Sequence, residues 1–376
     1  MSLTPDRERL FEEILAQLHF QAEVYPLEDK FDRIPLSLSR IFVLDVTKVP
    51  GCHYGLRNVF VPIIKNLEEI RNKGRTRVTP DNAILVEPST GNGWVAFSDA
   101  AEALGYEHLV VMPDGLPEAR YKHPSGRLVK IIKTSKELYA KGMPLQLKSM
   151  LDSNPDRIKN GEKIYVSPNH AVAAHNLAAS TMAELGKQLV DQLKPKRPLT
   201  VVASMGNGAS ICALGEYVMT HTALAKIIAT ESFAYGGGYD WFARQHPPFW
   251  RRYAEIFGFE PGNPVLLTGF KTWGTNAPIG IRLPLQARAI EGSLLSDYSL
   301  FTDNDVLAAY DKGPTTAMIS MMEGVAPRLL PNYSNLPSCL IDTYGNSTLA
   351  NIAVAERAQE PGRITVAMAY DSRNNY

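Results

Sequence analysis

The strongest constraint on the fold is a short apolar run that passes through a polar loop directly into a helix. Residues 84–106 read ILVEPSTGNGWVAFSDAAEALGY. Residues 84–86 have the pattern of a buried strand, and apolar residues recur at helical spacing from Val95 to Leu104, after which Gly105 predicts a helix end. A loop in this place points backbone N–H groups and the positive end of the helix dipole at whatever lies above the sheet. The loop therefore predicts a site for a carboxylate or a phosphate, with an ordinary helix entry as the alternative.

Residues 199–217 repeat this order of strand, glycine-rich loop and helix. LTVVAS predicts a strand, MGNGAS a loop and ICALGEY the start of a helix. Gly206 and Gly208 let the backbone turn sharply and approach a ligand closely, and Ser210 can donate a hydroxyl hydrogen at the helix start. Because Ile211 takes the place of the last glycine, the loop is not G-x-G-x-x-G, and no Walker-type Gly-Lys-Ser/Thr follows. Two such loops in one chain indicate a single ligand with two anionic ends.

The composition excludes several classes of function. The 39 basic and 39 acidic residues leave no net charge that would favour nucleic acid as a partner. No run of 18 apolar residues is present, and the start MSLTPDRERLFEEIL predicts an amphipathic helix, so we expect a cytoplasmic protein without a membrane segment. The three cysteines lie too far apart in the sequence for a disulfide framework or a metal site: Cys52, Cys212 and Cys339.

Strands and helices alternate along most of the chain, which predicts an α/β fold with parallel sheets and ligand loops at the carboxyl ends of the strands. Residues 233–262 interrupt this alternation and predict an insertion of loop and short helix. The expected helices are 5–18, 58–70 and 210–220, and the expected strands include 199–204 and 225–231.

The length of 376 residues allows two domains. A charged stretch with two prolines at 193–198 indicates the boundary between them. We expect residues 1–45 to form an N-terminal helix and lead-in that pack on the large domain. Residues 46–190 would form a small domain with the first loop, and residues 191–376 the large domain with the second loop.

Both loops resemble those of the fold type II pyridoxal-phosphate family, which is cysteine synthase or cystathionine β-synthase-like. EPSTGNGWVAF is similar to the family's Glu-Pro-Thr-Ser-Gly-Asn-Thr-Gly run, and SMGNGASICALGEY to its Gly-Thr-Gly-Gly-Thr phosphate loop. Further similar segments follow in the family's order at 169–176, 228–231, 282–284, 345–348 and 364–376, so the resemblance covers roughly residues 40–376. It implies two domains, each with a mainly parallel twisted sheet flanked by helices, as in the tryptophan synthase β-subunit.

The resemblance also implies residue roles. The substrate carboxylate would be held by Ser89, Thr90, Gly91 and Asn92, and the cofactor by Asn92, Gly206, Asn207, Gly208, Ala209, Ser210, Ser347 and Thr348. The implied ligands are pyridoxal 5'-phosphate and a small amino acid, and the implied assembly is a homodimer. The N-terminal helix supports the homodimer, because its apolar face needs cover: Leu10, Phe11, Ile14, Leu15 and Leu18.

One departure from the family changes the chemistry that the resemblance implies. The family's cofactor lysine lies in Pro-Gly-Gly-Ser-Val-Lys-Asp-Arg, and the corresponding run here, residues 50–57, has Gly55 at the lysine position. That lysine bonds to the cofactor's aldehyde and moves protons at the substrate Cα, and glycine can do neither. The nearest lysines are Lys48, a rival amine, and Lys65, which lies about 15 Å farther along the predicted helix. His53 and Tyr54 lie beside this position, and they are either acid–base groups or residues that pack within the loop.

Other residues have a functional and a structural interpretation. Cys52 is a candidate nucleophile or a small buried residue. His170 and His175 lack a third ligand nearby in the sequence, so we expect no metal. The run 236–238 is a flexible loop or a second phosphate site, and Asp371 and Arg373 are expected to close the domain interface.

Two functional hypotheses remain. In the first, the chain is an enzyme that binds pyridoxal phosphate without a covalent bond and acts on an amino acid by β-elimination or β-replacement, as a lyase or transferase. In the second, it is a lysine-less relative that binds a phosphorylated or carboxylated small molecule as a sensor, a partner subunit or a catalyst of another reaction.

Overall fold

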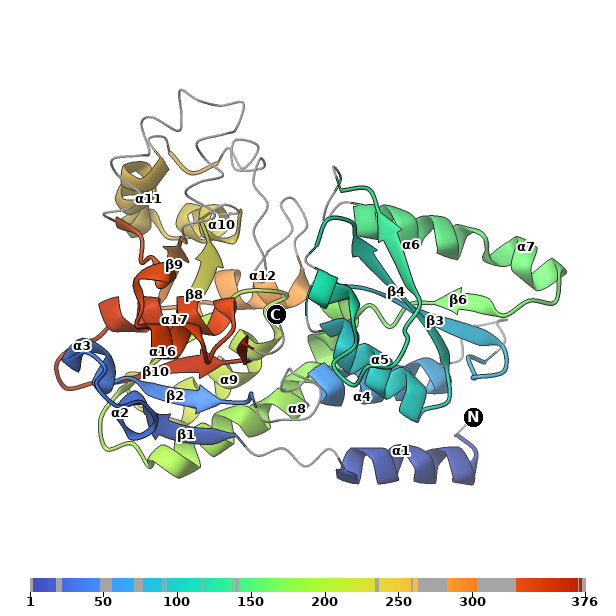
Figure 1. Cartoon of the computed structure of the whole chain (residues 1–376), viewed down its shortest axis with the longest axis horizontal. Helices are drawn as coiled ribbons and strands as arrows, with labels where there is room; N and C mark the ends of the chain where they lie inside the picture. The colour runs from blue at the N-terminus through green and yellow to red at the C-terminus, as the bar shows by residue number, and fades with distance from the viewer. Residues whose placement is uncertain are drawn as a thin grey trace. The chain divides into compact units, whose positions relative to one another are not determined.

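The computed structural model forms two compact units (Figure 1). The first contains residues 1–21, 47–181 and 375–376, and the second contains residues 22–46 and 182–374. The expected N-terminal section 1–45 is therefore divided between the units. The structure describes residues 3–17, 22–47, 56–70, 77–89, 91, 93–116, 118–136, 138, 142–233, 237–257, 260–262, 283–302, 329–370 and 372–373, without the side chains of 17, 56–58 and 172–182.

The first unit contains a four-stranded parallel sheet in the order β5-β4-β3-β6. Apolar side chains of β3 and β4 alternate between its faces, because successive residues of a strand point to opposite sides. Val86 and Val111 pack against α6, whereas α4 and α5 pack against each other and α5 contacts the sheet. The strands are β3 (Ala83–Pro88), β4 (Glu107–Pro113), β5 (Ile131–Thr134) and β6 (Ile164–Val166). The helices are α1 (Pro5–Gln17), α4 (Leu56–Glu69), α5 (Gly93–Ala103), η1 (Glu118–Tyr121), α6 (Gly142–Asp152) and α7 (Asn154–Lys159).

The N-terminal helix α1 packs on α4 within the first unit. Arg7 of α1 donates to the buried carboxylate of Glu68 on α4, at 2.9 and 3.0 Å from its Nε, and Tyr106 donates to the same carboxylate at 2.8 Å. Phe11 and Ile14 are buried, and Leu15 remains partly exposed. Much of the apolar face that needed cover is therefore covered within the chain, which removes the argument for a dimer based on this helix.

The second unit contains a six-stranded sheet in the order β1-β2-β10-β7-β8-β9. All neighbours are parallel except β1, which runs antiparallel to β2 at the edge. On one face α17 packs on Val202 and Ile228 in a large apolar cluster, and on the other α9 approaches Ile227 so closely that Gly215 has no room for a large side chain. The strands are β1 (Glu23–Pro26), β2 (Phe42–Asp45), β7 (Leu199–Ser204), β8 (Lys226–Ser232), β9 (Asp297–Phe301) and β10 (Ile364–Ala369).

The helices of the second unit follow the strands in the alternating order of an α/β fold. The insertion at 233–262 contains α10, η3 and α11, as predicted. The helix α8 (His170–Leu193) begins in the first unit and ends in the second. The others are α2 (Leu27–Lys30), α3 (Leu36–Ser39), α9 (Ala209–His221), α10 (Gly237–Gln245), η3 (Pro247–Phe249), α11 (Trp250–Phe257), α12 (Pro284–Glu291), η5 (Tyr333–Asn335), α16 (Ser338–Ile341) and α17 (Asn346–Arg357).

The predicted α/β class with two mainly parallel sheets is confirmed. The predicted helix and strand bounds agree with the structure to within two residues. Gly105 ends α5 as predicted and has a left-handed φ of 78°, which a glycine adopts without a steric penalty. Among the helices that the structure describes, none combines the length and the apolar character that a membrane crossing needs.

A fully buried amide side chain joins three strands of the second unit at their carboxyl ends. Asn351 of α17 accepts hydrogen bonds at Oδ1 from Ser204 Oγ (3.0 Å) and Thr230 Oγ1 (2.7 Å), and its Nδ2 donates to the carbonyl of Met368 (2.8 Å). These partners lie at the ends of β7, β8 and β10. A buried amide with all of these bonds made fixes the position of α17 relative to the three strands.

Replacement of Asn351 by alanine should destabilise the second unit. The change leaves the Ser204 and Thr230 hydroxyls and the Met368 carbonyl without their partner, and each buried unpaired group costs about 1–3 kcal/mol. Denaturant unfolding should show a clear loss of stability for Asn351→Ala and little change for Asn335→Ala, whose side chain is exposed. Equal stability of the two variants would contradict a structural role for the buried amide.

Candidate functional site

The second predicted loop lies at the carboxyl end of β7 and leads into α9. Gly208 precedes the helix with a left-handed φ of 89°. A Cβ at this position would lie 2.8 Å from backbone atoms of Leu285 and Gln286. Both the backbone conformation and the close approach therefore require glycine.

The same loop presents backbone donors at the start of a helix. Among the described residues, no acceptor pairs with the amides of Gly206, Asn207 and Gly208, whereas the amide of Ala209 donates to Asn207 Oδ1 at 3.0 Å. The carbonyl of Gly206 accepts from Gln286 Nε2 at 2.6 Å, and this hydrogen bond ties the loop to α12. Open amides together with the dipole of α9 have the geometry that favours an anion, as the sequence predicts for this loop.

Two further predicted residues lie at the start of α17, near the same carboxyl edge of the sheet as the loop. The Ser347 carbonyl accepts from Ser204 Oγ at 3.5 Å, and the Ser347 hydroxyl makes no hydrogen bond within the described residues. Thr348 is fully buried, and its Oγ1 accepts from the amide of Tyr370 at 3.0 Å. Tyr370 in turn accepts from the amide of Ser204 at 3.2 Å, a contact that the sequence did not indicate. Ser347 is thus available to a ligand, whereas Thr348 already bonds to the backbone.

The first predicted loop follows β3 in the first unit. Ser89 is buried, its hydroxyl donates to the carbonyl of Gly91 at 3.2 Å, and its amide donates to Val111. Of the four residues predicted to hold the substrate carboxylate, the structure therefore describes Ser89 and Gly91. The predicted residues outside the described part of the chain are Lys48, Cys52, His53, Tyr54, Gly55, Thr90, Asn92, Gly236, Arg282 and Asp371.

A buried carboxylate at the end of β3 holds the start of α8. Glu87 accepts from the amide of Asn169 at 2.9 Å and from His170 Nδ1 at 2.5 Å. A carboxylate at a helix N-terminus satisfies free N–H groups and complements the helix dipole. His170 is therefore part of the cap of α8, and its partner Glu87 lies on β3 just before the first predicted loop. The described residues contain no cluster of three metal-ligating side chains.

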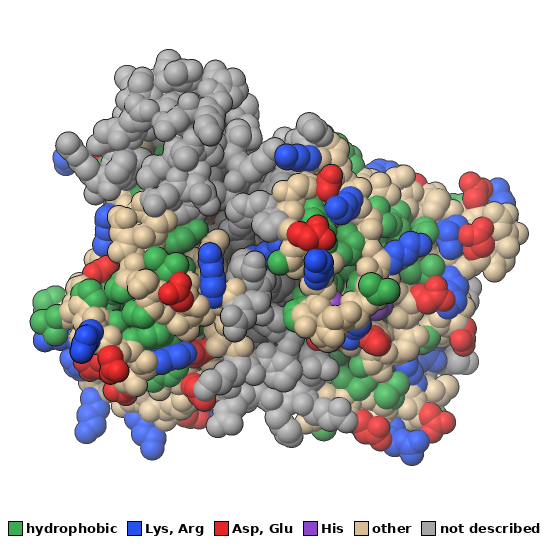
Figure 2. Space-filling model, in the orientation of Figure 1, with side chains coloured by type: hydrophobic (Ala, Val, Ile, Leu, Met, Phe, Trp, Pro, Cys, Tyr) green, Lys and Arg blue, Asp and Glu red, His purple; other side chains and the backbone are tan. Residues whose placement is uncertain are grey.

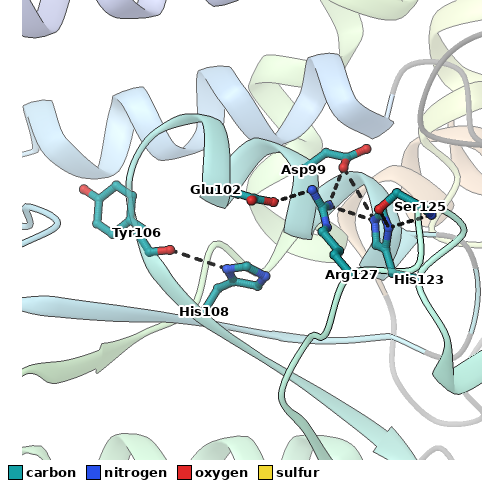
Figure 3. Close-up of polar contacts among 7 residues, drawn as sticks. All are labelled: Asp99, Glu102, Tyr106, His108, His123, Ser125 and Arg127. Atoms are coloured by element: carbon teal, nitrogen blue, oxygen red, sulfur yellow. Dashed lines mark hydrogen bonds and ion pairs between the residues drawn. The ribbon is translucent and has the colours of Figure 1, made fainter.

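A second polar cluster braces α5, the helix that follows the carboxylate loop (Figure 3). Arg127 forms ion pairs with Asp99 and Glu102 of α5. His123 lies beside them, with Arg127 2.8 Å from its Nε2 and Ser125 Oγ 2.8 Å from its Nδ1. Because a guanidinium can only donate, the Arg127 contact requires Nε2 to accept and therefore favours a neutral imidazole. The backbone amide of Ser125 lies 3.2 Å from Nδ1.

The cluster connects to the loop through an aromatic contact. The His123 ring meets the buried ring of Trp94, the second residue of α5, edge-on at 5.6 Å between centroids. Burial and, next, the Arg127 charge lower the pKa of His123, while Asp99 opposes the shift. Burial also lowers the pKa of His108, whose Nδ1 lies 3.4 Å from the Tyr106 carbonyl. Both shifts favour the neutral imidazole.

The described surface carries charges of both signs. On the face drawn in Figure 2, lysine and arginine side chains lie interspersed with aspartate and glutamate side chains on each unit. That face therefore offers mixed charge rather than a continuous basic surface.

Comparison with solved structures identifies the fold. The chain is similar to O-ureido-L-serine synthase (TM-score 0.62, 18% identity, covering 96% of this chain and 92% of that one). It is also similar to a hydrogen sulfide-producing enzyme from Fusobacterium nucleatum (TM-score 0.61, 16% identity, covering 100% of this chain and 99% of that one). A third similar structure is the cysteine synthase of Entamoeba histolytica (TM-score 0.60, 17% identity, covering 100% of this chain and 92% of that one). The fold is that of the fold type II pyridoxal-phosphate enzymes.

The fold type II likeness extends over nearly the whole chain but is distant in sequence. A variant of the same synthase in which alanine replaces a lysine, with O-ureido-L-serine bound, matches with a TM-score of 0.59 and 16% identity over 96% of this chain and 91% of that one. No protein-family model matches the sequence, and no curated protein matches it either. The predicted fold is therefore confirmed, whereas the site residues and the activity stay predictions.

We expect the protein to lose stability as the pH falls below about 6.5. The unfolded chain binds protons at its histidines from the ordinary value of 6.5 downwards, whereas the folded chain resists protonation of His108 and His123. The stability that the two neutral histidines contribute is complete above pH 6.5. It is lost as the pH falls from 6.5 through the lowered pKa values of the folded chain. The midpoint temperature of thermal unfolding should therefore decrease as the pH is lowered below about 6.5. The decrease should be less steep in His123→Gln, which keeps an acceptor for Arg127. The exposed His221→Gln variant is the matched control, and an unchanged slope in His123→Gln would count against the neutral imidazole.

The two glycines of the phosphate loop should respond differently to substitution. A Cβ at Gly206 meets no atom within 4 Å, so Gly206→Ala should fold normally, whereas Gly208→Ala should lower stability. Gly206→Asp places a carboxylate beside the open amides, and affinity for a phosphate-bearing probe such as pyridoxal phosphate should fall at least about tenfold. Calorimetry on Gly206→Asp, with Gly206→Ala as control, measures this, and equal affinities would rule out a phosphate at this loop.

Proposed function

We propose that the chain binds pyridoxal 5'-phosphate without a covalent bond and positions a small amino acid beside it. The observation that carries the proposal is the phosphate-type loop at 206–210, whose amides are open and whose Gly208 cannot be replaced without a clash. The fold type II likeness supports the choice of cofactor, because the solved relatives of this fold include cysteine synthase and O-ureido-L-serine synthase.

The residues at the carboxyl edge of the second sheet fit the cofactor. Under the proposal the amides of Gly206, Asn207 and Gly208 bind the phosphate, with Ala209 and Ser210 at the start of α9. Ser347 offers its hydroxyl to the ring nitrogen, since that hydroxyl is not used inside the described structure. Thr348 acts indirectly, because its hydroxyl holds the amide of Tyr370.

The amino-acid ligand would bind at the first loop. Ser89 and Gly91 already form a compact turn, and Thr90 and Asn92 complete the proposed carboxylate site. The Glu87–His170 cap fixes the strand end from which this loop departs.

The missing lysine limits the chemistry that this chain can perform. Pyridoxal phosphate supplies an electron sink that stabilises negative charge at the Cα of a bound amino acid. Gly55 can neither bond to the cofactor nor move a proton, so proton transfer in β-elimination or β-replacement would fall to His53, Tyr54 or Lys48. The lysine-to-alanine variant of O-ureido-L-serine synthase, which has O-ureido-L-serine bound, favours retention of amino-acid binding after loss of a lysine.

A second candidate function follows from the same glycine. The chain would then be a lysine-less relative that binds a phosphorylated or carboxylated small molecule as a sensor, a partner subunit or a catalyst of another reaction. Gly55 favours this candidate because it removes the group on which the family's covalent chemistry depends.

We also propose a homodimer, by analogy with the resembling family. The support comes from the resemblance alone, because α1 covers Phe11 and Ile14 within the chain. A mass near 41.5 kDa in light scattering across the micromolar range would rule it out.

Absorbance spectra before and after borohydride test the proposed function. Purified protein with pyridoxal phosphate should show saturable binding, release of the cofactor on denaturation and no borohydride-trapped lysine adduct. Gly55→Lys should acquire a reducible chromophore, with the adduct mapped to position 55 by peptide mass spectrometry, because it restores the amine at the family's position. Gly55→Met is the control, with a side chain of similar length and no amine.

Two outcomes would overturn parts of the proposal. A trapped adduct on Lys48 or another lysine of the unmodified protein would contradict noncovalent binding and indicate ordinary family chemistry. Absence of binding in all three proteins would favour the second candidate, in which the pocket serves another phosphorylated or acidic ligand.

A further inference from the structure

A lysine of the second unit lies in a site that has the features of an ammonium receptor. Lys30, the last residue of α2, donates from Nζ to Asp45 Oδ2 at 3.1 Å, to the Tyr25 hydroxyl at 2.8 Å and to the Tyr344 hydroxyl at 3.3 Å. A primary ammonium has three N–H donors and no acceptor, so three acceptors satisfy it completely.

Aromatic rings complete the surroundings of this ammonium. The Nζ of Lys30 lies 5.0 Å from the ring centroid of Tyr25, 5.0 Å from that of Tyr344 and 5.8 Å from that of Phe31. Rings at this distance attract a cation through their negative faces. The four side chains Tyr25, Phe31, Asp45 and Tyr344 are called the ammonium cage below.

One assignment of hydrogens satisfies both phenol hydroxyls and the ammonium of Lys30. Tyr25 donates to Asp45 Oδ2, so in the 2.7 Å contact between the two hydroxyls Tyr344 is the donor and Tyr25 the acceptor. Burial, then Tyr344 and Asp45, raise the pKa of Tyr25 above its ordinary value, so the phenol stays neutral. Asp45 is therefore the anion of the cage and Lys30 its cation.

Burial makes the carboxylate depend on a cation. The side chains of Asp45 and Tyr344 are 1% and 0% exposed, whereas that of Lys30 is 34% exposed. A buried carboxylate is costly unless it is paired and hydrogen-bonded. The anion and its acceptor partners are thus fixed in the core, and the cation reaches them from the surface on a flexible stem.

The described structure contains an ordinary lysine pair for comparison. Lys226 Nζ lies 2.6 Å from Glu360 Oε1, with both side chains about half exposed. No aromatic ring lies within cation–π reach of Lys226 in the described part of the chain. Water can replace this pair's contacts, whereas it cannot replace those of a buried carboxylate.

We propose that the ammonium cage is a binding site for a primary ammonium group, and that Lys30 is its built-in occupant. Its role is to hold the end of β2, since Asp45 is the last residue of that strand and Tyr344 lies two residues before the start of α17. The ligand class follows from the acceptors, because one carboxylate and two phenol oxygens select a cation with several N–H donors over a quaternary one.

Chemical rescue of a truncated lysine tests this proposal. Lys30→Ala removes the three methylenes and the ammonium that n-propylammonium supplies. Thermal unfolding of the full chain should show a midpoint lowered by about 5 °C or more. n-Propylammonium chloride, on the order of tens of millimolar, should restore much of this loss with a saturable dependence on concentration.

Matched controls separate the cage from general salt effects. Potassium chloride and tetramethylammonium chloride at the same concentrations should not restore Lys30→Ala, since neither offers N–H donors. Lys226→Ala should lose little stability and gain nothing from n-propylammonium. If Lys30→Ala does not fold, the stability of Lys30→Gln is measured in its place. In that case, n-propylammonium in the refolding buffer should also raise the yield of folded Lys30→Ala, and of no other variant.

The outcomes decide the proposal. Rescue by n-propylammonium of Lys30→Ala, and of neither control variant, supports the cage as an ammonium site. Equal rescue by potassium or tetramethylammonium, or a Lys30→Ala variant as stable as the unmodified protein, would overturn it. Neither result depends on binding of pyridoxal phosphate.

Discussion

The edge of the second unit that carries the proposed cofactor site depends on one buried amide. Asn351 joins β7, β8 and β10 near their carboxyl ends through Ser204, Thr230 and Met368. The phosphate-type loop begins at the end of β7, and α17 carries Ser347 toward the same edge. A displacement of Asn351 would therefore move both parts of the proposed cofactor site. Because a buried amide without partners costs more than its bonds contribute, the arrangement tolerates little variation.

The sequence predicted those features that local backbone geometry controls. The strand–loop–helix units at 84–105 and 199–217 appear in the structure, since alternation of strand and helix patterns requires no knowledge of distant residues. Gly105 was predicted to end a helix, and its left-handed φ confirms this. For the phosphate loop the prediction treated two glycines alike, but only Gly208 is left-handed and closely approached. The reason lies in the backbone of residues 285–286, which are distant in the sequence.

Residues that act through distant partners escaped prediction. Asn351 lies 147 and 121 positions from Ser204 and Thr230, and Glu87 lies 83 positions from His170. An asparagine within an alanine-rich helix, or a glutamate at a strand end, carries no local signal that it is buried. Lys30 looks like any surface lysine until the fold brings Tyr344 beside it. For Thr348, which the resemblance implies as a cofactor contact, the structure adds a distant partner that the sequence did not indicate, because its hydroxyl accepts from the amide of Tyr370.

The positions of the glycine and of the phosphate loop indicate how binding and chemistry separate in this chain. The loop is built from backbone amides at the start of α9, held by Gln286 and by contacts within the second unit. Gly55 falls in the range of the first unit. If glycine replaces the family's lysine there, as the resemblance implies, the reactive amine is absent while the amides and the helix dipole of the proposed anion site remain. Backbone donors also persist through side-chain substitution, because they are needed for the turn itself. Affinity for a phosphorylated ligand can therefore outlast the family's covalent chemistry, and a function based on binding is physically compatible with Gly55.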